Sequence, residues 1–483
     1  MTDVLAVWLG GLCAGTLTRT RPGGLRFTYD DAYRQRSNRP PLSLSMPKHA
    51  LEYDGAAVNH WFDNLLPDDD EVRRRWATDF EAASPSPFNL LASMGIDCAG
   101  AVQVVPTGVV PDQTGALEPV SPAEIETRLE SLRRDATLWN IDDHGGRWSL
   151  GGAQGKFALA QRTDGTWAAP TGRAASTHVF KVGVARFSHA DVAEFVTMRA
   201  AKHVGLTVAP VEIMRFGDQT ALVVQRYDRV ARDDGIHRFH QEDMCQALGI
   251  SRHAKYQSDD GPGVSDISDL IASLHPRSVR ASRELFARAL IYNWMTASPD
   301  AHAKNYSLLL AGDQARLAPL YDLTSGALLL DPDKVFFKGK SAMKIGGEYR
   351  FRNIDRSSLA RCAENLRVET DWLMGVAEQY RDQIPDAFEK ATLEAVADGG
   401  ELIAPGTKDR YVQGIRSTVA RAAAQAQIAT MKAESPAATR TKKPGRVRGK
   451  ATSSSNSQSF KTPERGEAVN VHLDVEPNDP FDL

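Results

Sequence analysis

The sequence contains few cysteines and no long apolar run, and these absences restrict the classes of protein to which it can belong. Its 483 residues include four cysteines, which lie far apart and form no Cys-x-x-Cys pair. This spacing argues against a disulfide framework or a cysteine-ligated metal centre, so we expect a protein of the reducing cytoplasm. No apolar stretch of roughly 18 residues is present, so we expect no transmembrane helix and no membrane partner. The apolar patch at 4–9 has no basic segment before it, which favours a strand and not a signal peptide.

The charge balance also lacks a dominant sign. Lysine and arginine number 58 and aspartate and glutamate 61, which gives a formal net charge of -3. The overall charge therefore does not favour binding to nucleic acid or to a membrane surface. A hydrophobic content of 42% is enough for ordinary globular cores, and the length allows one large two-part domain or two to three smaller ones.

Residues 1–106 form a first segment that we expect to be a small α+β subdomain. Two short strands flank a glycine turn at 10–11, a pattern typical of a hairpin. Two helices follow with a break at Pro67, and the three aspartates at 68–70 suit the N-terminus of the second helix. A strand over 100–106 ends this segment.

Residues 107–230 form a second segment, in which strands surround one amphipathic helix. A connection leads to a helix that begins with Ser121 and Glu124 in a capping-box arrangement. A glycine-rich loop follows and leads into the strands. The expected strands cover 157–162, 177–183, 211–216 and 221–229, and the expected helix covers 189–206.

Residues 231–434 are predicted to be mainly helical, and residues 435–483 to be disordered. The clearest helix, 281–297, is apolar on most faces, which indicates burial. The tail is rich in Ser, Thr, Pro, Gly and basic residues and has almost no large apolar residues. Its basic run near 440–450 could contact nucleic acid, although such a run is more often a solvated tail.

The strongest chemical signal is Asp300, followed five positions later by Asn305. This is the spacing of a protein-kinase catalytic loop. There the carboxylate accepts or orients the proton of a substrate hydroxyl, and the amide oxygen binds magnesium beside the phosphates. Lys304 could neutralise charge on the transferred phosphoryl group. On spacing alone, a polar loop with an aspartate turn is an equally good interpretation.

Three further residues fit the same chemistry. Asp322 lies at the end of an expected apolar strand, where it could make a second metal contact or simply cap the strand. Lys181 lies in an apolar strand and is costly to bury without an anion; in kinases such a lysine binds the α- and β-phosphates and pairs with a helix glutamate. Glu194 is the candidate partner. The alternatives are an outward-pointing Lys181 and a Glu194 that closes a capping box with Asp191.

The loop over 149–156 has three glycines that would let backbone N–H groups approach phosphate oxygens. It is not a Walker A loop, because Leu150 stands where the first glycine belongs and Phe157 stands where Ser or Thr belongs after Lys156. A glycine-rich loop by itself is a weak signal, since many are only turns.

Nine segments, in this order along the chain, resemble the HipA family of kinase toxins and cover roughly residues 1–390. They are FDNLLPDDDEVR, SLGGAQGKFAL, THVFKVG, LVVQRYDR, FHQEDMCQALGI, KYQSDDGPG, SPDAHAKNYSLLL, LAPLYDLTS and AMKIGGE. The resemblance implies an α+β fold, with the small N-terminal subdomain followed by a bilobal protein-kinase-like core. Its N-lobe, with a connecting segment, would be 107–230 and its mainly helical C-lobe 231–434.

The resemblance also implies an ATP- and Mg²⁺-dependent serine/threonine kinase. Asp300 would be the catalytic base, and Asn305 and Asp322 would bind the metal. The ATP-binding residues would be Gly151, Gly152, Ala153, Gln154, Gly155, Lys156, Lys181, Gln225, Arg226, Tyr227, His302, Ala303, Lys304, Asn305, Tyr321 and Asp322, with the backbone of 225–227 as the hinge to adenine.

Regulation and partners follow from the same resemblance. Ser149 matches a serine that family members autophosphorylate, and about two added negative charges on a phosphate-binding loop should repel nucleotide. The expected partners are a protein substrate in translation, such as an aminoacyl-tRNA synthetase, and a small helix-turn-helix antitoxin, with DNA reached only through that antitoxin.

The sequence departs from the family pattern at Gly155, where glutamate is common, at Tyr227, where phenylalanine is frequent, and in the extra basic tail. The main alternative is a catalytically degenerate kinase fold that acts as a co-repressor with a DNA-binding antitoxin. The intact set of Asp300, Asn305, Asp322 and Lys181 favours an enzyme. A kinase for a small molecule would use the same ATP machinery.

Overall fold

A computed structural model describes residues 3–20, 23–111, 115–139, 148–172, 174–183, 187, 189–232, 235–400 and 403–428. The predicted disorder of 435–483 lies outside these residues, as do residues 144–147, which include the glycines just before the loop at 149–156. The four cysteines are all described and all free, in agreement with the sequence prediction. Within the described ranges, no helix has the length and apolar composition needed to cross a bilayer.

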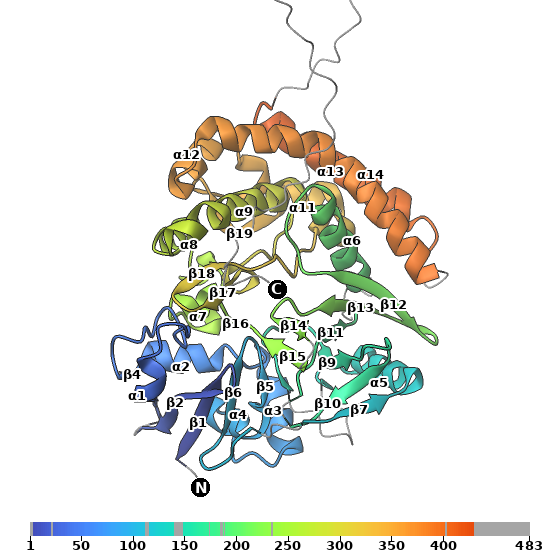
Figure 1. Ribbon diagram of the computed structural model, residues 1–483. Coiled ribbons are helices and arrows are strands. Elements are labelled where there is room, and N and C mark those ends of the chain that lie inside the picture. Colours follow the sequence, from blue (N-terminus) through green and yellow to red (C-terminus); the bar gives the residue numbers. More distant parts are fainter. Residues whose placement is uncertain are drawn as a thin grey trace, which may run out of the picture. The chain divides into compact units, whose positions relative to one another are not determined.

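The N-terminal segment is built on a five-stranded antiparallel sheet in the order β4-β3-β2-β1-β6 (Figure 1). The strands are β1 (Val4–Leu9), β2 (Leu12–Arg19), β3 (Leu25–Tyr29), β4 (Glu52–Asp54) and β6 (Val102–Pro106). The helices are α1 (Asp31–Arg34), α2 (Ala56–Asp63), α3 (Asp70–Asp79) and α4 (Pro87–Met94). Gly10 and Gly11 have positive φ angles, 57° and 79°, which glycine adopts without strain, and this confirms the predicted hairpin turn.

The helix break at Pro67 is also confirmed. Asp69 is the N-cap of α3, and its side chain accepts a hydrogen bond from the N–H of Glu71 at 2.7 Å. Only this one of the three aspartates caps the helix, so Asp68, one position earlier, is available for other contacts.

A six-stranded sheet follows, in the order β12-β13-β11-β9-β10-β7. Its strands are β7 (Leu117–Val120), β9 (Lys156–Gln161), β10 (Trp167–Pro170), β11 (His178–Lys181), β12 (Val211–Phe216) and β13 (Gln219–Gln225), and its helices are α5 (Pro122–Arg134) and α6 (Ala190–His203). The capping box of Ser121 and Glu124 is present at the start of α5. Buried side chains of this sheet, such as Phe157 and Phe180, share one core with the N-terminal segment. A short parallel pair, β5 (Asp97–Cys98) with β8 (Trp148–Ser149), also joins the two.

The remaining part is mainly helical and has its own core, which α6 joins. Its helices are α7 (Met244–Ala247), α8 (Val264–Ala272), α9 (Pro276–Met295), α10 (Gly326–Leu329), α11 (Pro332–Lys338), α12 (Arg356–Leu366), α13 (Thr370–Gly399) and α14 (Thr407–Gln425), with 3-10 turns η1 (Arg252–Ala254), η2 (Gln257–Asp259), η3 (Ala303–Asn305) and η4 (Phe351–Asn353). Its strands are β14 (Arg229–Arg232), β15 (Gly235–Arg238), β16 (His240–Asp243), β17 (Ser307–Ala311), β18 (Gln314–Leu317), β19 (Lys340–Ile345) and β20 (Glu348–Arg350). The burial of α9 is confirmed, although the helix begins at Pro276 and not at 281.

The predicted local structure at Asp322 is wrong. Asp322 does not end a strand, because β18 stops at Leu317 and Asp322 lies in the loop beyond it. Its φ of 54° is in the left-handed region, which aspartate tolerates better than most side chains. A single parallel bridge between Val208 and Leu320 holds this loop against the end of the six-stranded sheet. The tertiary contact therefore positions Asp322, and no local strand does so.

Candidate active site

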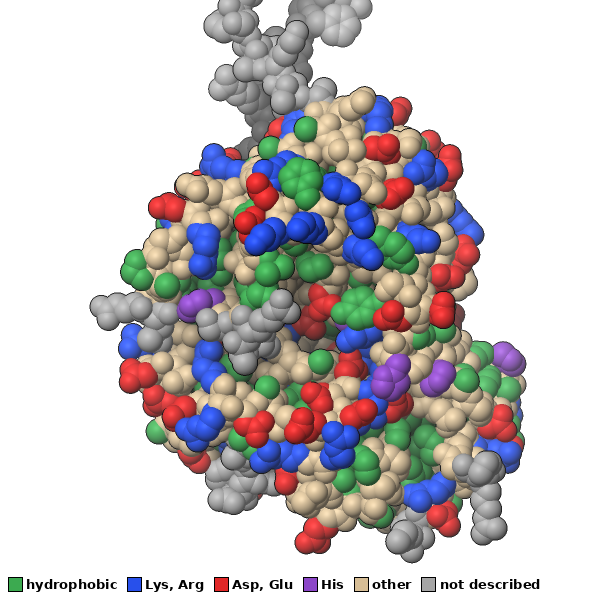
Figure 2. Space-filling model, turned by 180° about the vertical axis from the view of Figure 1, so that it is seen from behind, with side chains coloured by type: hydrophobic (Ala, Val, Ile, Leu, Met, Phe, Trp, Pro, Cys, Tyr) green, Lys and Arg blue, Asp and Glu red, His purple; other side chains and the backbone are tan. Residues whose placement is uncertain are grey.

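A cavity of about 300 Å³ lies where the six-stranded sheet, the helical part and the N-terminal segment meet. Most of the predicted site residues line it. They are Gly151, Gly152, Ala153, Gln154, Lys156, Lys181, Glu194, Gln225, Arg226, Tyr227, Asp300, His302, Lys304, Asn305, Tyr321 and Asp322. Figure 2 shows one face of the molecule, which is hollowed near its centre and on which acidic and basic side chains are mixed.

Two lysines lie directly opposite each other in this sheet. Lys156 on β9 pairs with Lys181 on β11 in the antiparallel register, and both are buried, with 6% and 5% of their surface exposed. Like charges in such a pair repel each other, so the arrangement is costly unless an anion compensates it. Lys181 has carboxylate partners, described below, so Lys156 is the member of the pair best suited to bind an anionic group of a ligand.

Burial of the ammonium group is costly for Lys156. Its Nζ donates to the carbonyl oxygen of Gly151 at 2.7 Å, and it has no ion-pair partner among the described residues. Burial, and then the charge of Lys181, lower the pKa of Lys156 to about 7. The side chain can thus gain a full charge when a phosphate group approaches.

Lys181 is held between two carboxylates. Its Nζ lies 2.7 Å from Oε1 of Glu194 on α6, and it also contacts Oδ1 of Asp322. The two alternatives for these residues are wrong. Lys181 does not point outward, and Glu194 does not cap its helix, because His189 is the N-cap of α6 and Asp191 pairs with Arg133.

The loop after α9 contributes Asp300 and Asn305 to the lining of the cavity. The Nδ2 of Asn305 donates to the backbone oxygen of Asp300 at 2.8 Å, which fixes the side-chain amide and leaves its Oδ1 to bind a ligand. The hydroxyl of Tyr256 donates to Oδ1 of Asp300. Burial lowers the pKa of His302 to about 4, although Asp300 opposes this shift, so the imidazole is neutral near pH 7. The Nδ1 of His302 is buried and has no hydrogen-bond partner within the described ranges.

The donor set is compatible with magnesium. The oxygens of Asn305 and Asp322 are hard ligands, and they line the same cavity. Among the described residues, no group of three or more His, Cys, Asp or Glu side chains could hold a metal ion by itself. A cation here would therefore need further ligands, such as phosphate oxygens or water, which is the usual situation for magnesium in phosphoryl-transfer sites.

The cavity also has an apolar end in its lining residues Val179, Ala209 and Val224, where Val179 and Val224 are paired neighbours on β11 and β13. The ring of Tyr227 lies beside that of Tyr321, with centroids 5.8 Å apart, and the hydroxyl of Tyr321 donates to the carbonyl oxygen of Lys304 at 2.6 Å. This end could hold a flat, weakly polar ring while the lysines bind its charged part.

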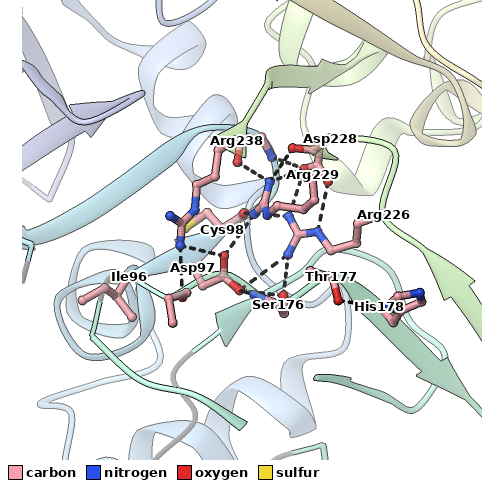
Figure 3. Close-up of polar contacts among 12 residues, drawn as sticks. Ile96, Asp97, Cys98, Ser176, Thr177, His178, Arg226, Asp228, Arg229 and Arg238 are labelled. Atoms are coloured by element: carbon pink, nitrogen blue, oxygen red, sulfur yellow. Dashed lines mark hydrogen bonds and ion pairs between the residues drawn. The ribbon is translucent and has the colours of Figure 1, made fainter. Parts of the chain in front are cut away.

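The backbone expected to bind adenine is partly engaged with the protein itself. The N–H of Gln225 donates to Pro210 and that of Arg226 to Thr177, each at 2.9 Å. The Arg226 side chain belongs to a buried ionic cluster with Asp228, Arg229, Arg238 and Asp97 (Figure 3). Arg226 therefore helps to fix the segment expected to form the hinge. The N–H of Tyr227 has no hydrogen-bond partner within the described part of the chain, so it could donate to a ligand.

Three predicted residues do not line the cavity. A Cβ at Gly155 would lie 3.2 Å from the carbonyl oxygen of Ala136, so this glycine allows close packing against the segment after α5. Ala303 is buried inside η3. Ser149 is fully buried, and its hydroxyl donates to the carbonyl oxygen of Leu65 in the N-terminal segment at 2.8 Å.

Several lining residues were not predicted, and the most notable are charged. Asp68 comes from the N-terminal segment, and Lys255 and Asp243 come from the helical part; the uncharged Asn64 also comes from the N-terminal segment. The segments FDNLLPDDDEVR and KYQSDDGPG carry Asp68 and Lys255, but neither has a spacing that identifies a role. The signal was the aspartate run itself, which has more carboxylates than one helix cap needs.

Comparison with known proteins identifies the family of the chain. Residues 148–388 match the model of the HipA-like C-terminal domain, and residues 5–105 match that of the HipA N-terminal domain. The chain is 36% identical over 420 residues to the protein Y4mE of Sinorhizobium fredii, covering 86% of this chain and 94% of the relative. It is 30% identical over 370 residues to the serine/threonine-protein kinase toxin HipA of Shewanella oneidensis, covering 73% and 81% of the two chains.

A solved structure is similar over most of the chain. It is HipA in the complex of HipA, HipB and operator DNA from Shewanella oneidensis MR-1, with a TM-score of 0.71 and 27% identity, covering 87% of this chain and 97% of that one. The mixed helix-and-sheet fold is thereby confirmed. The chain belongs to the HipA family.

Proposed function

We propose that this chain is an ATP- and Mg²⁺-dependent serine/threonine protein kinase that acts as a HipA-like toxin. The observation that supports this most is the convergence of a buried lysine pair with Asp300, Asn305 and Asp322 in one cavity. The names of the relatives agree with it. In this proposal the six-stranded sheet and the helical part are the two lobes of a kinase-like core, with the cavity between them.

Each residue then has a physical role. Asp300 accepts the proton of the substrate hydroxyl, and Lys181 and Lys156 bind the phosphates. Bound magnesium would supply charge stabilisation beside these phosphates, with Asn305 and Asp322 as its protein ligands. The apolar end of the cavity would hold the adenine ring.

Partners belong to the same proposal. We infer a protein substrate in translation, such as an aminoacyl-tRNA synthetase, and a small helix-turn-helix antitoxin that contacts DNA on behalf of the pair. The complex formed by the structural relative, which contains HipB and operator DNA, supports the second inference.

The direct test is incubation with magnesium and γ-labelled ATP, followed by mass spectrometry. We expect phosphate on Ser149, no label in Asp322→Ala, and loss of that one phosphosite in Ser149→Ala. Because Ser149 is buried against Leu65, its modification requires the loop to leave this position, so the phosphorylated chain should bind ATP more weakly. A wild-type chain that binds ATP and incorporates no label would refute the kinase proposal.

A second prediction concerns the uptake of a proton by Lys156 when ATP binds. At pH 8 Lys156 is mostly neutral in the free chain, because its pKa is about 7. A bound phosphate favours the charged form, so ATP binding at pH 8 should take up about one proton, and affinity should fall as pH rises above 7. Calorimetric titration in two buffers with different ionisation enthalpies measures this uptake. Lys156→Met should abolish it, and an unchanged uptake in that variant would contradict the assignment.

A further inference from the structure

Asp68 stands apart from the two aspartates that follow it. Asp69 caps α3, and Asp70 pairs with Arg252 at the surface, with 60% of its side chain exposed. Asp68 points into the cavity instead, with only 10% of its side chain exposed. A buried carboxylate is costly unless it is paired, so its partners should indicate why it lies there.

Both oxygens of Asp68 are bonded to lysines of the helical part. Oδ1 lies 2.6 Å from Nζ of Lys304, and Oδ2 lies 2.9 Å from Nζ of Lys255. The N–H of Asp68 also donates to the carbonyl oxygen of Gly152 in the glycine-rich loop, at 2.9 Å. One residue of the N-terminal segment thus connects the glycine-rich loop with two lysines of the helical part.

The two lysine partners determine the charge state of the Asp68 carboxyl. Burial alone would raise the pKa of the Asp68 carboxyl, but the ammonium groups of Lys304 and Lys255 outweigh it, so the pKa lies well below its usual range. The carboxylate is therefore ionised at any physiological pH, and the three side chains carry one net positive charge between them.

This group lies at the end of the cavity where phosphates are expected. A Cβ at Gly151 would lie 3.6 Å from Nζ of Lys304, and a Cβ at Gly152 would lie 2.7 Å from Nζ of Lys156. The Lys304 ammonium is thus next to the glycine-rich loop, together with the phosphate-binding lysine pair.

We propose that Asp68 is a positioning residue for phosphoryl transfer. It holds the ammonium groups of Lys304 and Lys255 at the place where the terminal phosphate of ATP lies, and through Gly152 it holds the loop over that phosphate. The inference rests on the proposed kinase function and extends it, because it gives the N-terminal segment a part in the active site.

The test uses the opposite effects expected for binding and turnover in Asp68→Asn. Removing one negative charge from the phosphate end should strengthen ATP binding about tenfold. The freed lysines lose their fixed positions, so the rate of transfer at saturating ATP should fall about 100-fold. Calorimetry with a non-hydrolysable ATP analogue gives the affinity, and label incorporation at saturating ATP gives the rate.

Two variants serve as controls. Asp70→Asn removes the same charge two positions away and should change neither quantity, and Asp68→Glu, which keeps the charge, should recover part of the rate. Weaker binding together with slower transfer in Asp68→Asn would indicate a merely structural role and overturn the proposal, as would unchanged kinetics. If the wild type binds ATP and transfers no phosphate, the proposed kinase function is refuted. Tighter ATP binding by Asp68→Asn would in that case still support the placement of Asp68 beside the phosphates.

Discussion

Replacing Asp300 by asparagine should slow phosphate transfer by about 10²–10⁴-fold, the usual contribution of a general base. Asparagine has nearly the same shape, and its amide oxygen can still accept the hydrogen bond from Tyr256. The backbone oxygen of Asp300, which holds the Asn305 amide at 2.8 Å, is not altered. The variant should therefore keep its fold and its affinity for ATP, and lose only the ability to take up the proton of the acceptor hydroxyl.

The measurement is the rate of label transfer at saturating ATP, with the dissociation constant for ATP determined in parallel. Asp313→Asn is a suitable control, because Asp313 is an exposed aspartate in the turn between β17 and β18 and its loss changes the net charge equally. An Asp300→Asn variant that transfers phosphate as fast as the wild type would remove Asp300 from the catalytic role. If an inactive variant is as toxic to cells as the wild type, the toxicity does not depend on phosphate transfer.

The parts of the fold that could be predicted from the sequence are those determined by interactions between neighbouring residues. The hairpin at Gly10 and Gly11, the capping box of Ser121 and the helix break at Pro67 each depend on a few neighbouring residues. Such signals survive in the folded chain because tertiary contacts do not oppose them. The start of α9 at Pro276 was missed, since the apolar pattern of that helix begins later than its backbone does.

The parts that could not be predicted depend on long-range contacts. The strand register that sets Lys156 against Lys181 is fixed by the pairing of β9 with β11, and no spacing in the sequence specifies it. The pairing of Asp68 with Lys304 joins residues 236 positions apart. Asp322 was expected at a strand end, but its place depends on the bridge between Val208 and Leu320. The candidate site could thus be predicted as a set of residue types, while the electrostatics that distinguish its members required the structure.

The buried ionic cluster of Asp97, Arg226 and Arg229 should be a sensitive point for stability (Figure 3). Asp97 on β5 lies 3.0 Å from Arg229, and its other oxygen accepts two hydrogen bonds from Ser176. Burial would raise the pKa of this carboxyl, but Arg229 and Arg226 hold it well below its usual range. Asp97→Ala would leave buried guanidinium groups with less compensating charge, so the free energy of unfolding should fall by about 3–5 kcal/mol.

Urea unfolding followed by tryptophan fluorescence should show this loss as a lower midpoint of the first transition. Asp54→Ala is the matched control, because Asp54 pairs with Arg26 at the surface with 65% of its side chain exposed, and such pairs contribute about 0–1 kcal/mol. Since Arg226 belongs to both the cluster and the proposed hinge segment, Asp97→Ala should also weaken ATP binding, even though Asp97 does not line the cavity. A variant with the stability and ATP affinity of the wild type would show that the cluster neither stabilises the chain nor positions its hinge.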